Sequence, residues 1–251
     1  MEKSINVLVN RIRSVLCGTG LNLLLYGSCV LDDFRLGWSD IDILCMTDDD
    51  LTEDQAQTLV GLRQELMENY PDLPYFRAFE GHICSKNALM HGGKVVYWGT
   101  SGQRIKPKCD LDPFSRLLIA ENGRVICGDD IRYLIKKPSR DELHAAVREH
   151  YRSIREHGSK TGQSLYSAGW ILDIARCLYT LRTGGIIGKT QAGEWALENG
   201  MAGDEDVMRR VLAIRRAPLE HKADPAVLEW LGALGPKVQE YADVLERKLG
   251  L

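Results

Sequence analysis

The sequence predicts a mixed α/β domain followed by an all-α helical bundle, and two observations support this. In the first half of the 251-residue chain, short apolar runs alternate with helical patterns. After Pro138 the strand patterns stop, and the later segments carry apolar residues at helical spacing. We therefore expect two domains, residues 1–137 and 138–251. No internal repeat or low-complexity segment is visible.

In the first domain the patterns predict both strands and helices. Strands are expected near residues 22–26, 40–46, 75–84 and 94–98, with a short edge strand at 125–127. Residues 4–16 carry apolar side chains at helical spacing. Thr52 and Gln55 form a capping-box pattern, which predicts a helix ending near Asn69, before Pro71.

The second domain is predicted to be helical throughout. Ser139 and Glu142 form another capping-box pattern, so a helix should run to about His157. A second helix is expected over 162–182, with Gly184 as its C-terminal stop. Three further helical patterns cover about 190–199, 204–216 and 225–249.

The composition is that of an ordinary folded protein with no basic excess. Apolar residues make up 44% of the chain and charged residues 27%, which permits a sizeable core. The net charge is -3 and the isoelectric point is near 6.1. Proteins that bind nucleic acid usually carry an excess of Lys and Arg. This chain has no such excess, so we expect no nucleic-acid partner. A mildly acidic balance suits a small cationic substrate.

The cysteines indicate a reducing compartment. There are seven, none in a Cys-x-x-Cys pair, so we expect no zinc site; they are Cys17, Cys29, Cys45, Cys84, Cys109, Cys127 and Cys177. Most lie in apolar runs, as small core residues do. Polar residues interrupt the first segment, and no apolar stretch is long enough for a membrane span. The expectation is a cytoplasmic protein without a membrane partner.

Two carboxylates in an apolar run form the strongest candidate for chemistry. Asp40 and Asp42 flank Ile41 in a predicted strand, so their side chains share one face about 7 Å apart, from the ~3.3 Å rise per residue. Buried carboxylates need a compensating cation. Mg²⁺ prefers oxygen ligands and keeps substrate phosphates as further ligands. The pair therefore indicates a magnesium site.

A Gly-Ser step upstream supplies a possible phosphate cradle. Gly27 follows a predicted buried strand and allows a sharp turn with the backbone close to a ligand. Ser28 can cap a short helix, whose N–H groups would bind phosphate. A cradle and a metal pair together are typical of phosphoryl or nucleotidyl transfer.

Two other motif readings are less suitable. The Asp-x-Asp motif of sugar-nucleotide glycosyltransferases usually lies deep in a long Rossmann-like domain, whereas here it occurs by residue 42, and that reading leaves the Gly-Ser step unexplained. The segment 183–190 is similar to a P-loop, but Thr183 occupies the position of the first glycine. A helix rather than a strand also precedes the segment.

Three blocks resemble the aminoglycoside adenylyltransferases that modify streptomycin and spectinomycin, within the nucleotidyltransferase superfamily. The first comprises Leu25-Tyr26-Gly27-Ser28 and Ser39-Asp40-Ile41-Asp42-Ile43-Leu44. The second, Arg77-Ala78-Phe79-Glu80, is similar to the strand that bears the family's catalytic glutamate. The third comprises Ala175-Arg176, Tyr179, Thr183-Gly184, Gly188-Lys189, Ala192 and Glu194-Trp195-Ala196. The resemblance covers about residues 20–200 and implies a nucleotidyltransferase domain with a mixed sheet.

The resemblance also implies roles for the site residues of the first block and for Glu80. Asp40 and Asp42 would hold two Mg²⁺ ions, with Glu80 as a further metal ligand. Ser28 and Ser39 would touch the phosphates of ATP. Glu80 would be the general base for the acceptor hydroxyl, and we keep His82 as the rival because its pKa suits base chemistry at neutral pH.

The helical domain is implied to complete the nucleotide and acceptor site. Arg176 and Lys189 would bind the ATP phosphates. Streptomycin-modifying members carry a tryptophan and acidic residues before and at the start of the second C-terminal helix. Residues 156–166 hold neither a tryptophan nor an aspartate, which favours spectinomycin over streptomycin and is compatible with another amino-alcohol.

The expected function is Mg-dependent transfer of AMP from ATP to an aminoglycoside hydroxyl, which would inactivate the antibiotic and give resistance. The alternatives are a regulatory, antitoxin-like module and an enzyme that acts on an unrelated small molecule. Antitoxin-like chains are usually short and lack a helical half. We expect a monomer.

Overall fold

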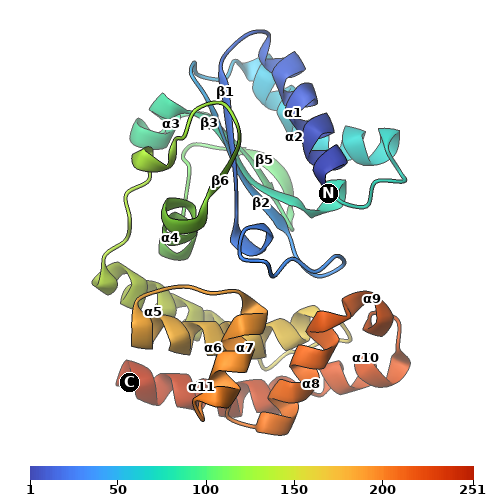
Figure 1. The fold of residues 1–251 in the computed structure, drawn as a ribbon, viewed down its shortest axis with the longest axis vertical. Helices are drawn as coiled ribbons and strands as arrows, with labels where there is room; N and C mark the ends of the chain where they lie inside the picture. Colours follow the sequence, from blue (N-terminus) through green and yellow to red (C-terminus); the bar gives the residue numbers. More distant parts are fainter. The chain divides into compact units, whose positions relative to one another are not determined.

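The computed structural model describes residues 1–251, which form two compact units (Figure 1). Unit 1 contains Met1–Val30, Asp40–Leu111 and Leu118–Lys136. Unit 2 contains Leu31–Ser39, Asp112–Leu117 and Lys137–Leu251. The single boundary expected near Lys137 would place both short segments, 31–39 and 112–117, in the first domain.

Unit 1 is built around a six-stranded mixed sheet with the strand order β5-β4-β3-β2-β1-β6. The strands are β1 (Leu21–Tyr26), β2 (Ile41–Thr47), β3 (Phe79–Ser85), β4 (Val95–Gly99), β5 (Gly102–Lys106) and β6 (Arg124–Cys127). Strands β2 and β3 are parallel, and the other neighbouring pairs are antiparallel. This confirms the predicted mixed sheet.

The sheet is central because its middle strands are apolar on both faces. All six residues of β1 are buried, as are six of the seven in β2. Helix α1 (Glu2–Leu16) buries Ile5, Leu8, Val9, Ile12 and Leu16, the stripe that the sequence predicted. Helix α2 (Glu53–Asn69) begins with the predicted Thr52–Gln55 capping box and lies beside α1 (Figure 1).

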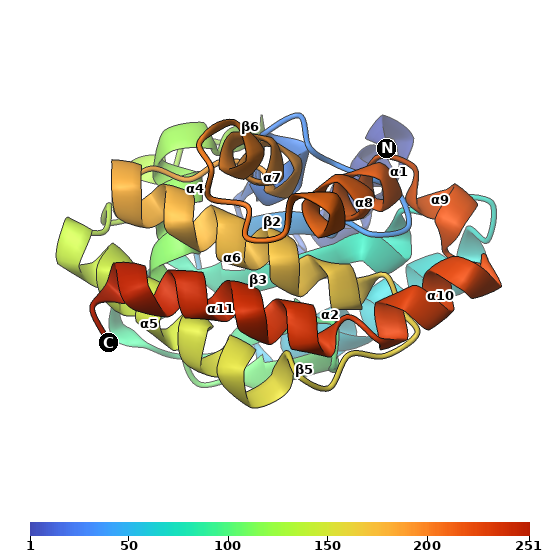
Figure 2. The same ribbon diagram turned by 90° about the horizontal axis from the view of Figure 1, so that it is seen from below.

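Unit 2 is a helical bundle. Its helices are α5 (Arg140–His157), α6 (Tyr166–Thr183), α7 (Lys189–Glu198), α8 (Glu205–Arg216), α9 (Pro218–His221), α10 (Pro225–Gly232) and α11 (Gly235–Leu249). The predicted capping box starts α5, and Gly184, in the left-handed region with φ of 72°, ends α6. Helices α5, α6 and α11 run side by side (Figure 2).

The structure corrects the sequence prediction at several elements. The helix expected over 225–249 is two helices, because Pro236 near the start of α11 cannot donate the hydrogen bond that a continuous helix needs. The strand expected from Tyr75 begins at Phe79, after a 3₁₀ turn over Phe76–Ala78. Helices α3 (Lys86–His91) and α4 (Pro113–Asn122), helix α9 and strand β5 were not predicted.

The cysteines form no disulfide bonds. All seven cysteines are free thiols, and Cys45, Cys84 and Cys177 are buried. None of the helices combines the length and apolar character needed to traverse a bilayer.

Candidate active site

The carboxylates predicted in unit 1 lie on two neighbouring parallel strands. Asp42 is the second residue of β2, and Glu80 is the second residue of β3. The two are direct partners in the register, so both are carried on adjacent strands at the same level. Asp40 immediately precedes β2 rather than lying within it. The structure thus brings Asp42 and Glu80 together, as the metal and base assignments require.

Gly27 is needed because the chain turns sharply against Asp42. Its φ is 70°, in the region that favours glycine, and a Cβ atom there would lie 2.0 Å from Asp42 Oδ2. A short 3₁₀ turn, Gly27–Cys29, follows β1. Within it, Ser28 Oγ donates a hydrogen bond to the backbone carbonyl of Asp40 at 3.2 Å. The predicted cradle and the Asp pair are therefore adjacent.

Two residues that the sequence analysis missed surround Glu80. Thr100 Oγ1 donates a hydrogen bond to Glu80 Oε1 at 2.7 Å. Arg63 of α2 donates to the backbone carbonyls of Phe79 at 2.8 Å and Gly99 at 3.1 Å. Burial lowers the pKa of Arg63, and the nearby charges of Glu80 and Asp40 oppose that shift. No local sequence pattern singles out either residue, since their partners are 16 to 36 positions away.

His82, the rival general base, is a buried strand residue. Its side chain is 5% exposed, and its ring packs on Tyr97 with centroids 4.9 Å apart. It alternates with Gly81 on β3 and so faces the same side of the strand as Glu80. Glu80 is the more accessible of the two.

The donor chemistry around Asp42 fits a hard divalent cation. Carboxylate oxygens are the ligands that Mg²⁺ prefers, and Asp42 and Glu80 approach from adjacent strands. No group of three or more His, Cys, Asp or Glu side chains is arranged to hold a metal ion. The assignment of Asp40, Asp42 and Glu80 as magnesium ligands therefore stays a prediction, supported by register and ligand type.

Ser39, the other predicted phosphate contact, belongs to unit 2 and closes a turn. Its N–H donates to the carbonyl of Arg35 at 2.8 Å, and its hydroxyl accepts from the Arg35 N–H at 3.0 Å. Both bonds fix the backbone directly before Asp40.

The predicted phosphate-binding cations of unit 2 share one carboxylate. Arg176 on α6 donates to Asp173 Oδ1 at 2.9 Å, and Lys189, the first residue of α7, donates to Asp173 Oδ2 at 3.1 Å. All three side chains are about a fifth to a quarter exposed. The sequence analysis missed Asp173, although its i,i+3 spacing from Arg176 is a recognisable helix ion pair.

The charges in this cluster shift one another's pKa. Burial raises the pKa of Asp173, but Lys189 and Arg176 outweigh it and hold the pKa below its ordinary value. Burial lowers the pKa of Lys189 despite the attraction of Asp173. His150, whose ring stacks on Phe114 with centroids 4.9 Å apart, has its pKa lowered by burial. The cluster is therefore a partly desolvated, net positive patch.

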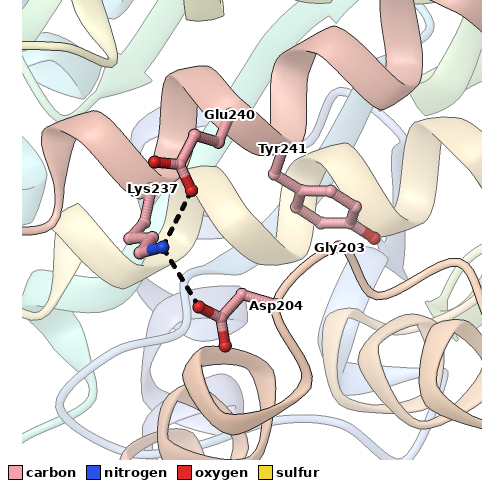
Figure 3. A pocket seen from close by; sticks show the side chains of 5 residues that line it. All are labelled: Gly203, Asp204, Lys237, Glu240 and Tyr241. Atoms are coloured by element: carbon pink, nitrogen blue, oxygen red, sulfur yellow. Dashed lines mark hydrogen bonds and ion pairs between the residues drawn. The ribbon is translucent and has the colours of Figure 1, made fainter.

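A separate pocket in unit 2 contains none of the predicted site residues. It encloses about 360 Å³ and is lined by Gly203, Asp204, Lys237, Glu240 and Tyr241. Lys237 Nζ lies between Glu240 Oε2 at 2.8 Å and Asp204 Oδ2 at 3.2 Å (Figure 3). Its cation is thus already paired with two carboxylates, and we assign no function to this pocket.

Comparison with known proteins identifies the helical half. Residues 134–229 match the family model described as the aminoglycoside adenylyltransferase C-terminal domain. Over these residues the chain is similar to that family's C-terminal domain. The match confirms the resemblance read from the sequence and, with it, the expected nucleotidyltransferase class of enzyme. A comparison with curated protein sequences gives no match.

The fold of the whole chain agrees with this similarity. The chain is similar to the crystal structure of the spectinomycin adenyltransferase AAD(9) from Enterococcus faecialis with ATP and spectinomycin. The TM-score is 0.66 at 17% sequence identity, and the match covers 98% of this chain and 99% of that one. At this identity the likeness shows the fold, which extends over both halves.

Proposed function

We propose that the protein transfers AMP from ATP to a hydroxyl group of an aminoglycoside-type antibiotic. The observation that carries the proposal is the register of β2 and β3, which sets Asp42 opposite Glu80 beside the Gly27 turn. The family match of the helical half and the fold shared with a spectinomycin adenyltransferase support it.

In the proposed reaction, the acceptor hydroxyl oxygen attacks the α-phosphorus of ATP. The bond between the α-phosphorus and the bridging oxygen breaks, and pyrophosphate leaves. Glu80 takes the hydroxyl proton, and Thr100 holds the carboxylate through its 2.7 Å hydrogen bond. Ser28, Ser39, Arg176 and Lys189 would bind the phosphates.

Asp40, Asp42 and Glu80 would hold two Mg²⁺ ions, which supply neutralisation of the charge that develops on the phosphates. The Gly27 turn brings the backbone against Asp42, so that the phosphate cradle and these carboxylates form one region of unit 1. The carboxylates of unit 1 also suit a cationic acceptor.

We further propose spectinomycin as the preferred acceptor, with resistance as the consequence. The segment 156–166 lacks the tryptophan and aspartate associated with streptomycin in the family. The seven free thiols support the expected cytoplasmic location. The monomeric state and the lack of a nucleic-acid partner stay predictions.

The direct test is to incubate the protein with ATP, Mg²⁺ and a panel of aminoglycosides, and to look for added AMP by mass spectrometry. We expect an adduct on spectinomycin, formed faster than any on streptomycin. An adduct only on an unrelated amino-alcohol would show that the substrate is not an aminoglycoside. No adduct on any acceptor, with ATP bound, would favour a regulatory module.

A further inference from the structure

A buried ion pair in unit 2 joins the segment 31–39 to a distant helix. Asp33 and Arg215 of α8 are each 2% exposed. Arg215 donates from one guanidinium nitrogen to Asp33 Oδ2 at 2.8 Å and to the Asp33 backbone carbonyl at 3.2 Å. The guanidinium therefore holds both the side chain and the backbone of this residue.

The same carboxylate caps the start of α7. Thr190, the second residue of α7, donates its N–H to Asp33 Oδ2 at 3.1 Å and its hydroxyl to Asp33 Oδ1. Arg215 Nε in turn donates to Thr190 Oγ1 at 3.1 Å. The N-cap position of α7 is Gly188, which has no side chain for this role. Asp33 thus supplies from another segment the oxygen that an N-cap residue would provide.

The fit between Asp33 and α7 leaves no room for a side chain at Gly188. A Cβ atom on Gly188 would lie 2.7 Å from Asp33 Cβ and 2.9 Å from its Oδ2. A larger residue would push the segment away from the helix. Gly188 therefore permits the close approach that the hydrogen bonds require.

The two pieces of chain that meet here carry predicted phosphate contacts. Ser39 ends the anchored segment, and its turn is closed on Arg35. Trp38 lies against Arg215, with 5.3 Å between the guanidinium carbon and the ring centroid. Lys189 directly precedes Thr190 at the start of α7. The Asp33 network thus holds the segment of Ser39 and the helix of Lys189 in one fixed arrangement.

We propose that Asp33 is a positioning residue, which fixes the segment 31–39 on the start of α7 so that Ser39 and Lys189 are preorganised for the phosphates of ATP. This role rests on the proposed function. A buried ion pair is often no more stabilising than apolar residues of similar volume, so stability alone explains it poorly. What the network adds is directional hydrogen bonds at the junction of two ligand-binding segments.

The test compares four variants with the native protein. Asp33→Asn removes the charge, and Thr190→Val removes one hydroxyl but keeps the helix N–H. Thr190→Ser keeps both donors. Arg155→Met breaks a more exposed arginine network, between α5 and α11, that includes the Gln239 carbonyl, Asp243 and Glu246 and none of the proposed site residues.

Two measurements separate positioning from stability. Calorimetry gives the Kd of Mg-ATP without acceptor, and hydrogen exchange follows the backbone amides of residues 31–39 in the nucleotide-free protein. We expect Asp33→Asn and Thr190→Val to weaken Mg-ATP binding tenfold or more and to speed exchange in 31–39. Thr190→Ser should match the native protein. Arg155→Met should lower Tm without changing either quantity.

The outcomes are distinct. Native Mg-ATP affinity in Thr190→Val and Asp33→Asn, with a lowered Tm, would show a purely structural role and overturn the proposal. If Asp33→Asn fails to fold, Thr190→Val decides alone. Failure of the native protein to bind Mg-ATP would overturn the proposed function and with it this role.

Discussion

Each unit contains a cluster of charged side chains, with carboxylates in excess in unit 1 and cations in excess in unit 2. In unit 1, Asp42 and Glu80 are register partners on neighbouring strands, and the guanidinium of Arg63 lies near Glu80 and Asp40. In unit 2, the single carboxylate of Asp173 is shared by two cations, Arg176 and Lys189. The first cluster suits a divalent cation or a cationic acceptor, and the second suits a polyphosphate.

In the proposed reaction the two clusters would have different electrostatic roles. Carboxylates are needed to hold metal ions and to take a proton, whereas cations are needed to bind the triphosphate. Asp173 keeps the two cations ordered, since like charges that are partly buried would otherwise repel each other. Predictions that remove one member of each cluster test this division.

The largest effect is expected at Asp42. Asp42→Asn should lower AMP transfer by about a thousandfold or more, which is roughly 4 kcal/mol, because the metal site loses charge. The fold should survive, as Tm should show. Asp49→Asn is the matched control, because Asp49 is exposed just beyond the other end of β2. Near-native turnover in Asp42→Asn would exclude the metal assignment.

The next effect is expected at Glu80 and should spare the nucleotide. Glu80→Gln should slow transfer by about 10²–10⁴ while Mg-ATP binds almost normally, because a general base acts on the acceptor proton. Single-turnover rates and calorimetry measure the two quantities. Collapse of nucleotide affinity with high residual turnover would leave Glu80 as a metal or structural ligand only, and would make His82 the candidate base.

In unit 2 the effect should fall on binding. Arg176→Met and Lys189→Met should each weaken Mg-ATP binding by about 10- to 100-fold, since a hydrogen bond to a charged group contributes about 1.5–3 kcal/mol. Arg182→Met is the control on the same helix, where Arg182 is exposed and bonded to Asn199. Equal Mg-ATP affinities in all three variants would show that neither Arg176 nor Lys189 binds the phosphates.

The smallest effect on activity is expected from the buried carboxylates of unit 2, whose contribution is to the pH dependence of stability. Burial raises the pKa of Asp33, but Arg215 and the hydrogen bonds from Thr190 outweigh it and hold the pKa below its ordinary value; Asp173 behaves alike. A depressed carboxyl pKa gives stability that is present above about pH 4 and is lost as pH falls through the folded pKa.

Urea unfolding between pH 7 and pH 3 measures this dependence. Asp33→Asn should lose about 3–5 kcal/mol at pH 7, because a buried pair is broken, and its stability should fall less steeply in acid. Equal acid slopes for the variant and the native protein would show that Asp33 does not contribute to the pH dependence.

Much of this architecture could be predicted where the pattern is local. The capping boxes at Thr52 and Ser139 and the stop at Gly184 depend on residues within one turn, and the structure confirms them. Strand β5 was missed because its residues are only partly buried and polar, so they lack a strand's apolar pattern. The break before α11 depended on one proline within an otherwise continuous apolar pattern.

For the site residues, too, only the local patterns could be predicted. The Gly27-Ser28 step and the Asp40/Asp42 spacing are sequence-local, so the pattern predicts them. Arg63, Thr100 and the Asp33–Arg215 pair join residues 16 to 182 positions apart, and only the folded chain reveals such partners. Asp33 in particular lies in a segment of mixed polar and apolar residues that resembles an ordinary loop.

The most direct test of the central claim is pyrophosphate release from Mg-ATP with and without spectinomycin. In the native protein we predict release that depends on spectinomycin and produces one AMP-drug adduct per pyrophosphate. Asp42→Asn should abolish both, whereas Asp49→Asn should retain them. Release without an adduct, or equal release in native protein and Asp42→Asn, would contradict AMP transfer at this carboxylate site.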